Sequence, residues 1–149
     1  MKRSGSAVWK GGLQDGKGTV SSDSGVLSNT PYTFKMRFEN DKGTNPEELV
    51  AAAHAACFSM ALSLFLGQAG MTAESIETRA TVSLDQVGGG FAVTSSHLET
   101  KVRIPNADKA AFDKAVETAK SGCPISKLLN AKITMDATLL APSGAALPT

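Results

Sequence analysis

The chain has 149 residues, of which 42% are hydrophobic and 19% are charged, and its formal net charge is +1. This length and apolar content indicate one globular domain with a sizeable core and exclude an intrinsically disordered chain. A net charge so close to zero argues against nucleic acid or an anionic membrane as a partner. The basic start, MKRSGSAVWKGG, lacks the apolar segment of a secretory signal, so we expect a cytoplasmic protein.

The first 44 residues are predicted to form short strands separated by turns. Strands are expected around Val8-Trp9 and around 19–21, next to glycine-rich turns. From Tyr32 to Phe38, apolar and polar residues alternate, and this alternation predicts a half-buried strand. On such a strand Arg37 lies on the face opposite Met36.

The segment from about residue 46 to 67 carries the clearest helix signals. Asn45 is a good N-cap, Pro46 suits the first turn, and Glu48 stands where a capping box has its glutamate. Its body, LVAAAHAACFSMALSLFL, is apolar on nearly every side, so we expect a helix buried on most faces. The run approaches the length of a membrane span, but His54, two serines and the glutamates favour a core helix.

Two strands are predicted after this helix, joined by the turn Gly88-Gly89-Gly90. In the first, Ser75 to Asp85, apolar residues alternate with charged ones. In the second, Phe91 to Ile104, the apolar phase changes along the strand, which predicts a bulge or strong bend near Ser95-Ser96. No lysine or helix start follows the glycines, so we interpret them as a turn and not as a phosphate-binding loop.

Two helices and a last strand are expected in the remainder of the chain. The first helix begins at Asn106 or Asp108 and runs to about Lys120, with Gly122 as its C-cap. A short helix over residues 123–130 follows, and then a strand in which Ile133, Met135 and Leu139 alternate with polar residues.

The predicted fold class is α+β, in one domain over residues 1–149. Its parts are N-terminal strands over 1–44, a central helix at about 46–67, a strand-helix part at 74–140 and a frayed tail at 141–149.

The two cysteines, Cys57 and Cys123, offer the most distinctive chemistry. Cys57 lies in the apolar helix, and Cys123 opens a Cys-Pro step at the start of the short helix. A free thiol has a pKa of about 8.5, so that roughly 3% is thiolate at neutral pH, and an apolar environment lowers that fraction. Cys57 therefore needs a neighbouring cation, for which Arg37 is the candidate, whereas a helix start favours the thiolate of Cys123.

Glu47 is the natural carboxylate partner for Arg37, because Glu48 is already explained by the helix cap. Glu47 precedes Cys57 by ten residues, which corresponds to about 15 Å along one straight helix. The two residues cannot meet within that helix, but Glu47 of a second copy, antiparallel across a two-fold axis, can approach this Cys57. We therefore expect an isologous homodimer with composite active sites.

These residues suggest a peroxidase. The Cys57 thiolate attacks the distal oxygen of a peroxide, giving an alcohol and a sulfenic acid, and Cys123 then displaces water to form a disulfide that an external dithiol reduces. Arg37 stabilises the negative charge on sulfur and on the departing oxygen. The alternative is a non-catalytic thiol redox sensor or small-molecule-binding protein. An organic hydroperoxide is favoured as substrate by the apolar residues Phe34, Met36, Phe58 and Met60.

The two histidines give weaker signals. His54 lies three residues from Cys57 on one helix, so a Cys-His relay is conceivable, but we favour a packed, hydrogen-bonded histidine. His97 has no evident partner in the sequence. Neither histidine stands at zinc-ligand spacing from the cysteines, and we expect no metal and no organic cofactor.

The segments NPEELVAAAHAACFSMAL and SGCPISKLL, with RFE before them, resemble the OsmC/Ohr family of thiol-dependent peroxidases, and its OsmC branch in particular. The resemblance covers nearly the whole chain. It implies an intertwined homodimer in which antiparallel sheets wrap around two central buried helices.

The resemblance also implies roles for individual residues: peroxidatic Cys57, resolving Cys123, catalytic Arg37 and its carboxylate partner Glu47. The reductant that it implies is a dithiol, such as a lipoylated protein. In the Ohr branch the arginine comes from the early glycine-rich loop, where this chain has only Lys17.

Overall fold

The computed structural model describes residues 1–143. The chain divides into two compact units, residues 1–49 and 50–149. The prediction of one domain over the whole chain stays a prediction. Of the predicted tail, residues 144–149 lie outside the described part of the chain.

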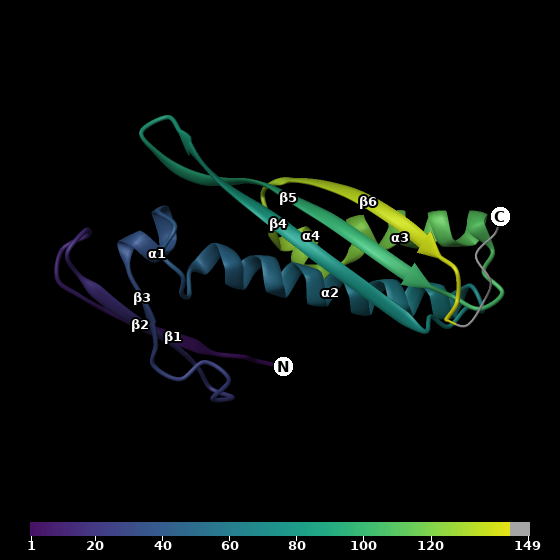
Figure 1. The fold of residues 1–149 in the computed structure, drawn as a ribbon, viewed down its shortest axis with the longest axis horizontal. Helices are drawn as coiled ribbons and strands as arrows, with labels where there is room; N and C mark the ends of the chain where they lie inside the picture. The colour runs from purple at the N-terminus through teal and green to yellow at the C-terminus, as the bar shows by residue number, and fades with distance from the viewer. Residues whose placement is uncertain (144–149) are drawn as a thin grey trace. The chain divides into compact units, whose positions relative to one another are not determined.

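The first unit contains an antiparallel sheet of three strands in the order β1-β2-β3 (Figure 1). Its strands are β1 (Gly5–Lys10), β2 (Lys17–Ser22) and β3 (Thr30–Tyr32). Gly18 is needed where the aromatic rings of Trp9 and Tyr32 approach the backbone. A Cβ at position 18 would lie 2.6 Å from an atom of each ring, so a larger residue would displace them.

The predicted strand from Tyr32 to Phe38 is wrong beyond Tyr32, because residues Phe34–Phe38 form a short helix, α1. Thr33 caps this helix by accepting a hydrogen bond from the Met36 backbone N–H at 3.2 Å. Apolar residues four apart lie on one side of a helix, and the rings of Phe34 and Phe38 are 4.9 Å apart. The alternation of apolar residues fits either structure over so short a stretch, and the threonine cap favours the helix.

The first unit has no buried apolar side chain. Within residues 1–49 only Gly16 and Gly18 are buried, and β1 is exposed along its whole length. A sheet normally gains its stability by burying one apolar face against another layer. This unit therefore lacks a core of its own in the single chain.

The long helix α2 (Pro46–Gln68) begins in the first unit and continues into the second, and its bounds confirm the predicted central helix. The side chain of Asn45 accepts a hydrogen bond from the Glu48 backbone N–H at 2.8 Å, which confirms the predicted N-cap. After the helix, Gly70 adopts a φ of +79°, a conformation that favours glycine. The chain then closes with a bond from the Met71 N–H to the Leu66 carbonyl.

The expectation that α2 is buried on most faces is wrong for the single chain. Its buried residues form one stripe with a spacing of four: His54, Phe58, Leu62 and Leu66. On other faces Met60 is 78% exposed and Leu64 is 57% exposed. Among the described residues, α2 is the one helix long and apolar enough to cross a membrane, a property that core helices of soluble proteins share.

The second unit is built on a three-stranded sheet in the order β4-β5-β6. Its strands are β4 (Ser75–Val87), β5 (Gly90–Arg103) and β6 (Lys132–Leu140). The pairing of β4 with β5 is antiparallel and shifts register where Ser83 and Leu84 face Ser95 and Val93, which confirms the predicted bulge close to its expected place.

The expectation of antiparallel sheets is wrong for β6, which pairs parallel to β5. Two helices, α3 (Lys109–Gly122) and α4 (Pro124–Leu128), connect these strands (Figure 1). A connection through helices returns the chain to the end of the sheet where β5 begins, and parallel pairing requires such a crossover.

The boundary between α3 and α4 places Cys123. The helix α3 begins after Asp108, whose carboxylate accepts hydrogen bonds from the backbone N–H groups of Ala110 and Ala111. Gly122, predicted as the C-cap, is instead the last helical residue. Cys123 follows it as the C-cap of α3 and the N-cap of α4.

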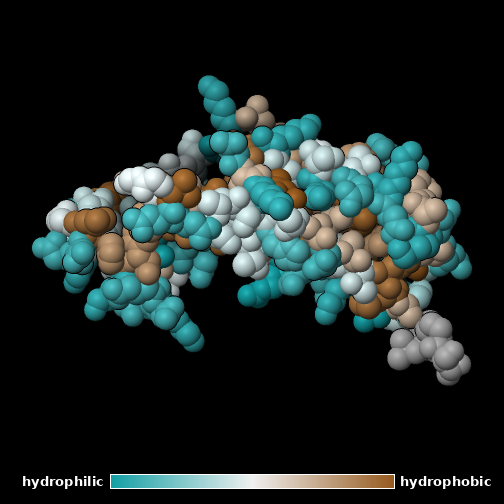
Figure 2. Space-filling view, turned by 90° about the horizontal axis from the view of Figure 1, so that it is seen from above, coloured by the Kyte–Doolittle hydropathy of each residue, from teal (hydrophilic) through white to brown (hydrophobic). Residues whose placement is uncertain are grey.

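The core of the second unit lies between the sheet, α2 and α3. Hydrophobic side chains also reach the surface among hydrophilic ones on the face drawn in Figure 2. The fully or nearly fully buried apolar side chains include Phe58, Leu62, Leu66, Leu98, Val102, Ile104, Phe112, Val116, Ala119 and Cys123.

Candidate active site

Cys57 and Cys123 lie next to each other in the second unit. Cys57 is on α2 and half-buried, whereas Cys123 is fully buried at the start of α4. Both are free thiols, and a hydrogen bond joins them. The structure therefore brings together the two sulfur atoms that the sequence analysis paired.

The sulfur of Cys123 accepts two hydrogen bonds from Ser126. The backbone N–H and the side-chain hydroxyl of Ser126 each lie 3.4 Å from it. Burial by itself would raise the pKa of Cys123, but the hydrogen bonds from the Ser126 side chain and backbone outweigh it. Together with the bonds from the Cys57 thiol and the Ile125 backbone, they lower the pKa of Cys123.

The pKa of Cys57 moves in the opposite direction. Burial raises the pKa of Cys57, a hydrogen bond from the Ile125 backbone lowers it, and the interaction with Cys123 raises it further. Within the pair the thiolate is therefore favoured at Cys123 over Cys57. This agrees with the expectation that Cys57 needs a cation before it can react.

Arg37 and Glu47 form an ion pair within the first unit. The Arg37 Nε and Nη2 atoms lie 3.2 and 3.0 Å from the Glu47 Oε1 atom, and Nε is also 3.4 Å from Oε2. Arg37 is on α1, and Glu47 is in the first turn of α2. The structure therefore brings together the arginine and the carboxylate that the sequence analysis paired.

A cavity of about 220 Å³ lies beside Arg37 within the first unit. Its walls are mainly aromatic, so it suits an apolar group that carries a polar end next to the guanidinium. Of the four apolar residues expected near the substrate, Phe34 lines this cavity, whereas Phe58 is part of the core of the second unit. The lining residues are Trp9, Leu13, Tyr32, Thr33, Phe34, Arg37 and Phe38.

His54 is fully buried on α2, and both of its ring nitrogens are hydrogen-bonded. Nδ1 lies 2.7 Å from the Ser96 hydroxyl on β5, and Nε2 lies 2.8 Å from the Ser126 hydroxyl on α4. Burial lowers the pKa of His54, so the imidazole is neutral at neutral pH. The favoured interpretation of His54 as a packed, hydrogen-bonded histidine is confirmed.

The contacts of Ser126 and Ser96 were not predicted from the sequence. Ser126 was open to prediction, because the third residue after an N-cap presents its backbone N–H to the capping side chain. Ser96 came to notice only as part of the predicted bulge. Its pairing with His54 joins a strand to a helix far away in sequence, and no local pattern signals it.

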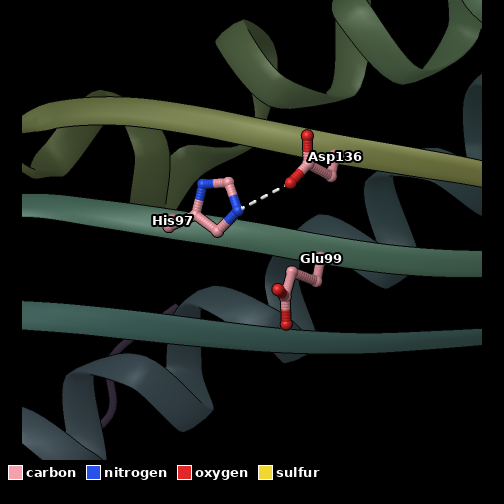
Figure 3. A group of neighbouring side chains, drawn as sticks. All are labelled: His97, Glu99 and Asp136. Carbon is pink, nitrogen blue, oxygen red and sulfur yellow. Dashed lines mark hydrogen bonds and ion pairs between the residues drawn. The ribbon is translucent and has the colours of Figure 1, made fainter.

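A second polar cluster lies on the sheet of the second unit, where His97, Glu99 and Asp136 have ligand atoms within 4.8 Å of one another. Figure 3 shows His97 of β5 directed toward Asp136 of β6. His97 was predicted to have no evident partner, and that is wrong, because Thr134 and Asp136 bind its two ring nitrogens. Arg79 is the cross-strand neighbour of Glu99 in the strand register, and we assign no metal to this cluster.

Comparisons with known proteins agree with these observations. Residues 39–138 match the family described as OsmC-like protein. The chain is 56% identical over 136 residues to peroxiredoxin OsmC of Escherichia coli, covering 91% of this chain and 95% of that protein. It is 30% identical over 121 residues to the organic hydroperoxide resistance protein of Xanthomonas axonopodis pv. citri, covering 80% and 83% of the two chains. The solved structure of organic hydroperoxide resistance protein OhrB of Bacillus subtilis matches with a TM-score of 0.68 and 27% identity, over 91% of this chain and 98% of that one.

The burial of His54 predicts a loss of stability in mild acid. A histidine in an unfolded chain has a pKa of about 6.5, whereas burial lowers the pKa of His54 in the folded state. Below about pH 6.5 the unfolded state therefore binds a proton more readily than the folded state does. The free energy of unfolding should therefore fall as pH decreases from about 7 to about 5.5, by at most about 1.4 kcal/mol per pH unit from this group. Urea denaturation at several pH values measures this slope. His54→Gln should flatten it and the control His97→Gln should not; equal slopes in the parent and His54→Gln would contradict the prediction.

Proposed function

Because this chain belongs to the family of OsmC-like proteins, we propose that it is a thiol-dependent peroxidase that reduces organic hydroperoxides to alcohols. The observation that carries the proposal is the pair of adjacent free thiols, of which Cys57 is partly accessible and Cys123 is buried. The printed names of the relatives, peroxiredoxin OsmC and organic hydroperoxide resistance protein, support the same reaction and substrate class.

The reaction proceeds in two steps on the protein. The Cys57 thiolate attacks the distal peroxide oxygen, the O–O bond breaks, and the alkoxide takes up a proton and leaves as the alcohol. The Cys123 thiolate then attacks the sulfur of the Cys57 sulfenic acid. An S–S bond forms as the S–O bond breaks, and the hydroxide takes up a proton and leaves as water. An external dithiol reduces the disulfide, and two free thiols at rest suit a reducing compartment such as the cytoplasm.

Arg37 has the chemistry to activate Cys57. Glu47 engages its Nε and Nη2 atoms, and a guanidinium has further N–H donors that remain for sulfur and for the peroxide oxygens. Glu47 also fixes the plane of the guanidinium, so that little side-chain entropy is lost when substrate binds. The aromatic cavity beside Arg37 accommodates the hydrocarbon part of an organic hydroperoxide.

The protein acts as a homodimer in this proposal. One face of α2 leaves Ala52, Ala56, Met60 and Leu64 exposed at helical spacing, and the first unit has no buried core. A second copy of α2, packed antiparallel through its small and apolar residues, covers such a face. Because Arg37 and Glu47 are paired within one chain, the chain that supplies Glu47 to a site supplies Arg37 as well.

Cysteine variants test the reaction. The parent should consume an excess of cumene hydroperoxide when a dithiol is present, because each disulfide is reduced and the cycle repeats. Cys57→Ser should consume none. Without the dithiol, Cys123→Ser should consume one equivalent and stop as a sulfenic acid, measured by stopped-flow and mass spectrometry. Full peroxide consumption by Cys57→Ser would overturn the proposal, and a parent that stops after one equivalent despite excess dithiol would indicate a redox sensor.

An arginine variant tests the role of the cation. Arg37→Gln should lower kcat/KM for the hydroperoxide by about 10² to 10³, the usual cost of removing one group that stabilises developing charge. The matched control is Arg79→Gln, which removes an exposed arginine of β4 and should leave kcat/KM unchanged. The role of Arg37 is refuted if both variants behave alike.

Mixed dimers test the assembly. Light scattering should give twice the mass of one chain. When Cys57→Ser and Arg37→Gln chains are mixed and allowed to exchange, about a quarter of the parental activity should return, because half of the dimers are mixed and each has one intact composite site. A monomer at micromolar concentration, or a dimeric mixture that recovers no activity, would exclude composite sites.

A further inference from the structure

A chain of buried polar groups leads from the sheet to the sulfur of Cys123. Ser96 of β5 meets His54 Nδ1 at 2.7 Å, His54 Nε2 meets the Ser126 hydroxyl at 2.8 Å, and that hydroxyl donates to the Cys123 sulfur at 3.4 Å. All four residues are buried, and all belong to the second unit. The reaction described above uses Cys123 but not the other three.

The proton positions in this chain follow from counting donors. A serine hydroxyl has one hydrogen, and Ser126 directs it to the Cys123 sulfur. The Ser126 oxygen must then accept its bond with His54, so that Nε2 carries the hydrogen of the neutral imidazole. Nδ1 is left as an acceptor and receives the Ser96 hydroxyl hydrogen. Every bond in the chain thus points toward sulfur.

The opposite arrangement arises when the Cys123 thiol donates its own hydrogen to Ser126. If the Cys123 thiol donated to Ser126, the Ser126 hydroxyl would donate to Nε2, and Nδ1–H would have to donate to Ser96. The tautomer of His54 therefore determines whether Ser126 offers the Cys123 sulfur a donor or an acceptor.

We propose that His54 is a positioning residue for Cys123: by donating from Nε2 to Ser126, it holds the Ser126 hydroxyl as a donor to sulfur and so stabilises the Cys123 thiolate. This inference rests on the proposed function, in which Cys123 resolves the sulfenic acid. A buried neutral histidine suits the task, because it fixes a direction of hydrogen bonding without adding a charge to the core.

The stabilised thiolate serves both halves of the cycle. In the resolving step it is the nucleophile that attacks the Cys57 sulfenic sulfur, and the hydroxide from that sulfur leaves as water after taking up a proton. In the reduction step the external dithiol, as thiolate, attacks the Cys57 sulfur of the disulfide, and Cys123 leaves as the thiolate. Disulfide exchange is faster when the leaving thiol has the lower pKa. Solvent exposure also directs the external thiolate to the Cys57 sulfur, because Cys57 is partly accessible and Cys123 is fully buried.

Two substitutions of His54 separate this role from simple packing. In His54→Gln the amide nitrogen takes the place of Nε2 and keeps a donor for Ser126. In His54→Asn the amide lies near the position of Nδ1, so that the contact with Ser96 remains and the donor to Ser126 is lost. Ser126→Ala removes the hydroxyl itself with little change in shape, and His97→Asn is the matched control on the surface of the sheet.

The first measurement titrates Cys123 by its thiolate ultraviolet absorbance, with Cys57→Ser as the common background so that one thiol remains. His54→Asn and Ser126→Ala should each lower the thiolate fraction near neutral pH by about tenfold, as expected for the loss of a hydrogen bond to a charged group. His54→Gln should restore most of that fraction, and His97→Asn should match the background protein. An equal change in His54→Gln and His54→Asn, or no change in Ser126→Ala, would overturn the proposal.

The second measurement follows single turnover with both cysteines present. In His54→Asn, sulfenic acid formation at Cys57 should keep its parental rate, whereas disulfide formation should slow by about tenfold with the thiolate fraction. Loss of the first step instead would show that His54 acts on Cys57 and would refute the assignment. Because the titration needs no turnover, a parent without peroxidase activity would refute the proposed function while the test of His54 still stood.

Discussion

The hydrogen bonds of His54 fix the packing around the two thiols. An otherwise apolar stretch of α2 contains this one imidazole, fully buried, with Ser96 of β5 on one nitrogen and Ser126 of α4 on the other. A buried polar group without a partner costs about 1 to 3 kcal/mol, so any sliding or rotation of α2 that breaks these bonds is penalised twice. Cys57 follows three residues later on the same helix. The register that satisfies the histidine is therefore the register that sets Cys57 beside Cys123.

Once the sulfur atoms are adjacent, their surroundings make them unequal. Donors from Ser126 surround the Cys123 sulfur, whereas burial dominates at Cys57, so the pKa values of the two thiols move in opposite directions. In the proposed reaction the thiol that attacks peroxide is the one without local stabilisation, and it depends on a guanidinium to ionise. That guanidinium belongs to a unit that has no core in the single chain. In the proposed homodimer, assembly and catalysis are linked, because the exposed apolar surfaces that a second copy would cover are on the elements that carry Arg37, Glu47 and Cys57.

The sequence predicted the features that depend on local chemistry. Asn45 was recognised as a cap, and Asp108 was one of two candidates with Asn106, because capping needs only a side-chain oxygen and the next few backbone N–H groups. The change of apolar phase in β5 was enough to predict the bulge, since alternation directly reports which face of a strand is buried. The pairing of Arg37 with Glu47 followed by elimination, once Glu48 had been assigned to the cap.

The failures have equally specific causes. Alternation over five residues does not separate a strand from one and a half helical turns, so α1 was misread. The direction of β6 depends on which end of the sheet the chain reaches after α4, and periodicity within a strand says nothing about its neighbours. The burial of α2 was inferred from composition alone. Composition does not distinguish apolar side chains that are buried within the same chain from those that remain exposed in the single chain. The contact of Ser96 with His54 was not predicted, because the two residues are 42 positions apart in sequence.

The different pKa shifts and exposures of the two thiols also affect which oxidants the protein reacts with. A thiolate open to solvent reacts with many oxidants, whereas Cys123 combines a lowered pKa with complete burial. In the proposed reaction Cys123 therefore meets the sulfenic sulfur of Cys57 and not the peroxide. Cys57 has the opposite combination of partial access and a raised pKa, so it remains a weak nucleophile until a cation approaches. In the proposed site that cation borders the cavity for the hydrocarbon group. Ionisation of Cys57 is then confined to the place where an organic hydroperoxide binds, and over-oxidation is limited because the resolving thiolate is already hydrogen-bonded in position beside it.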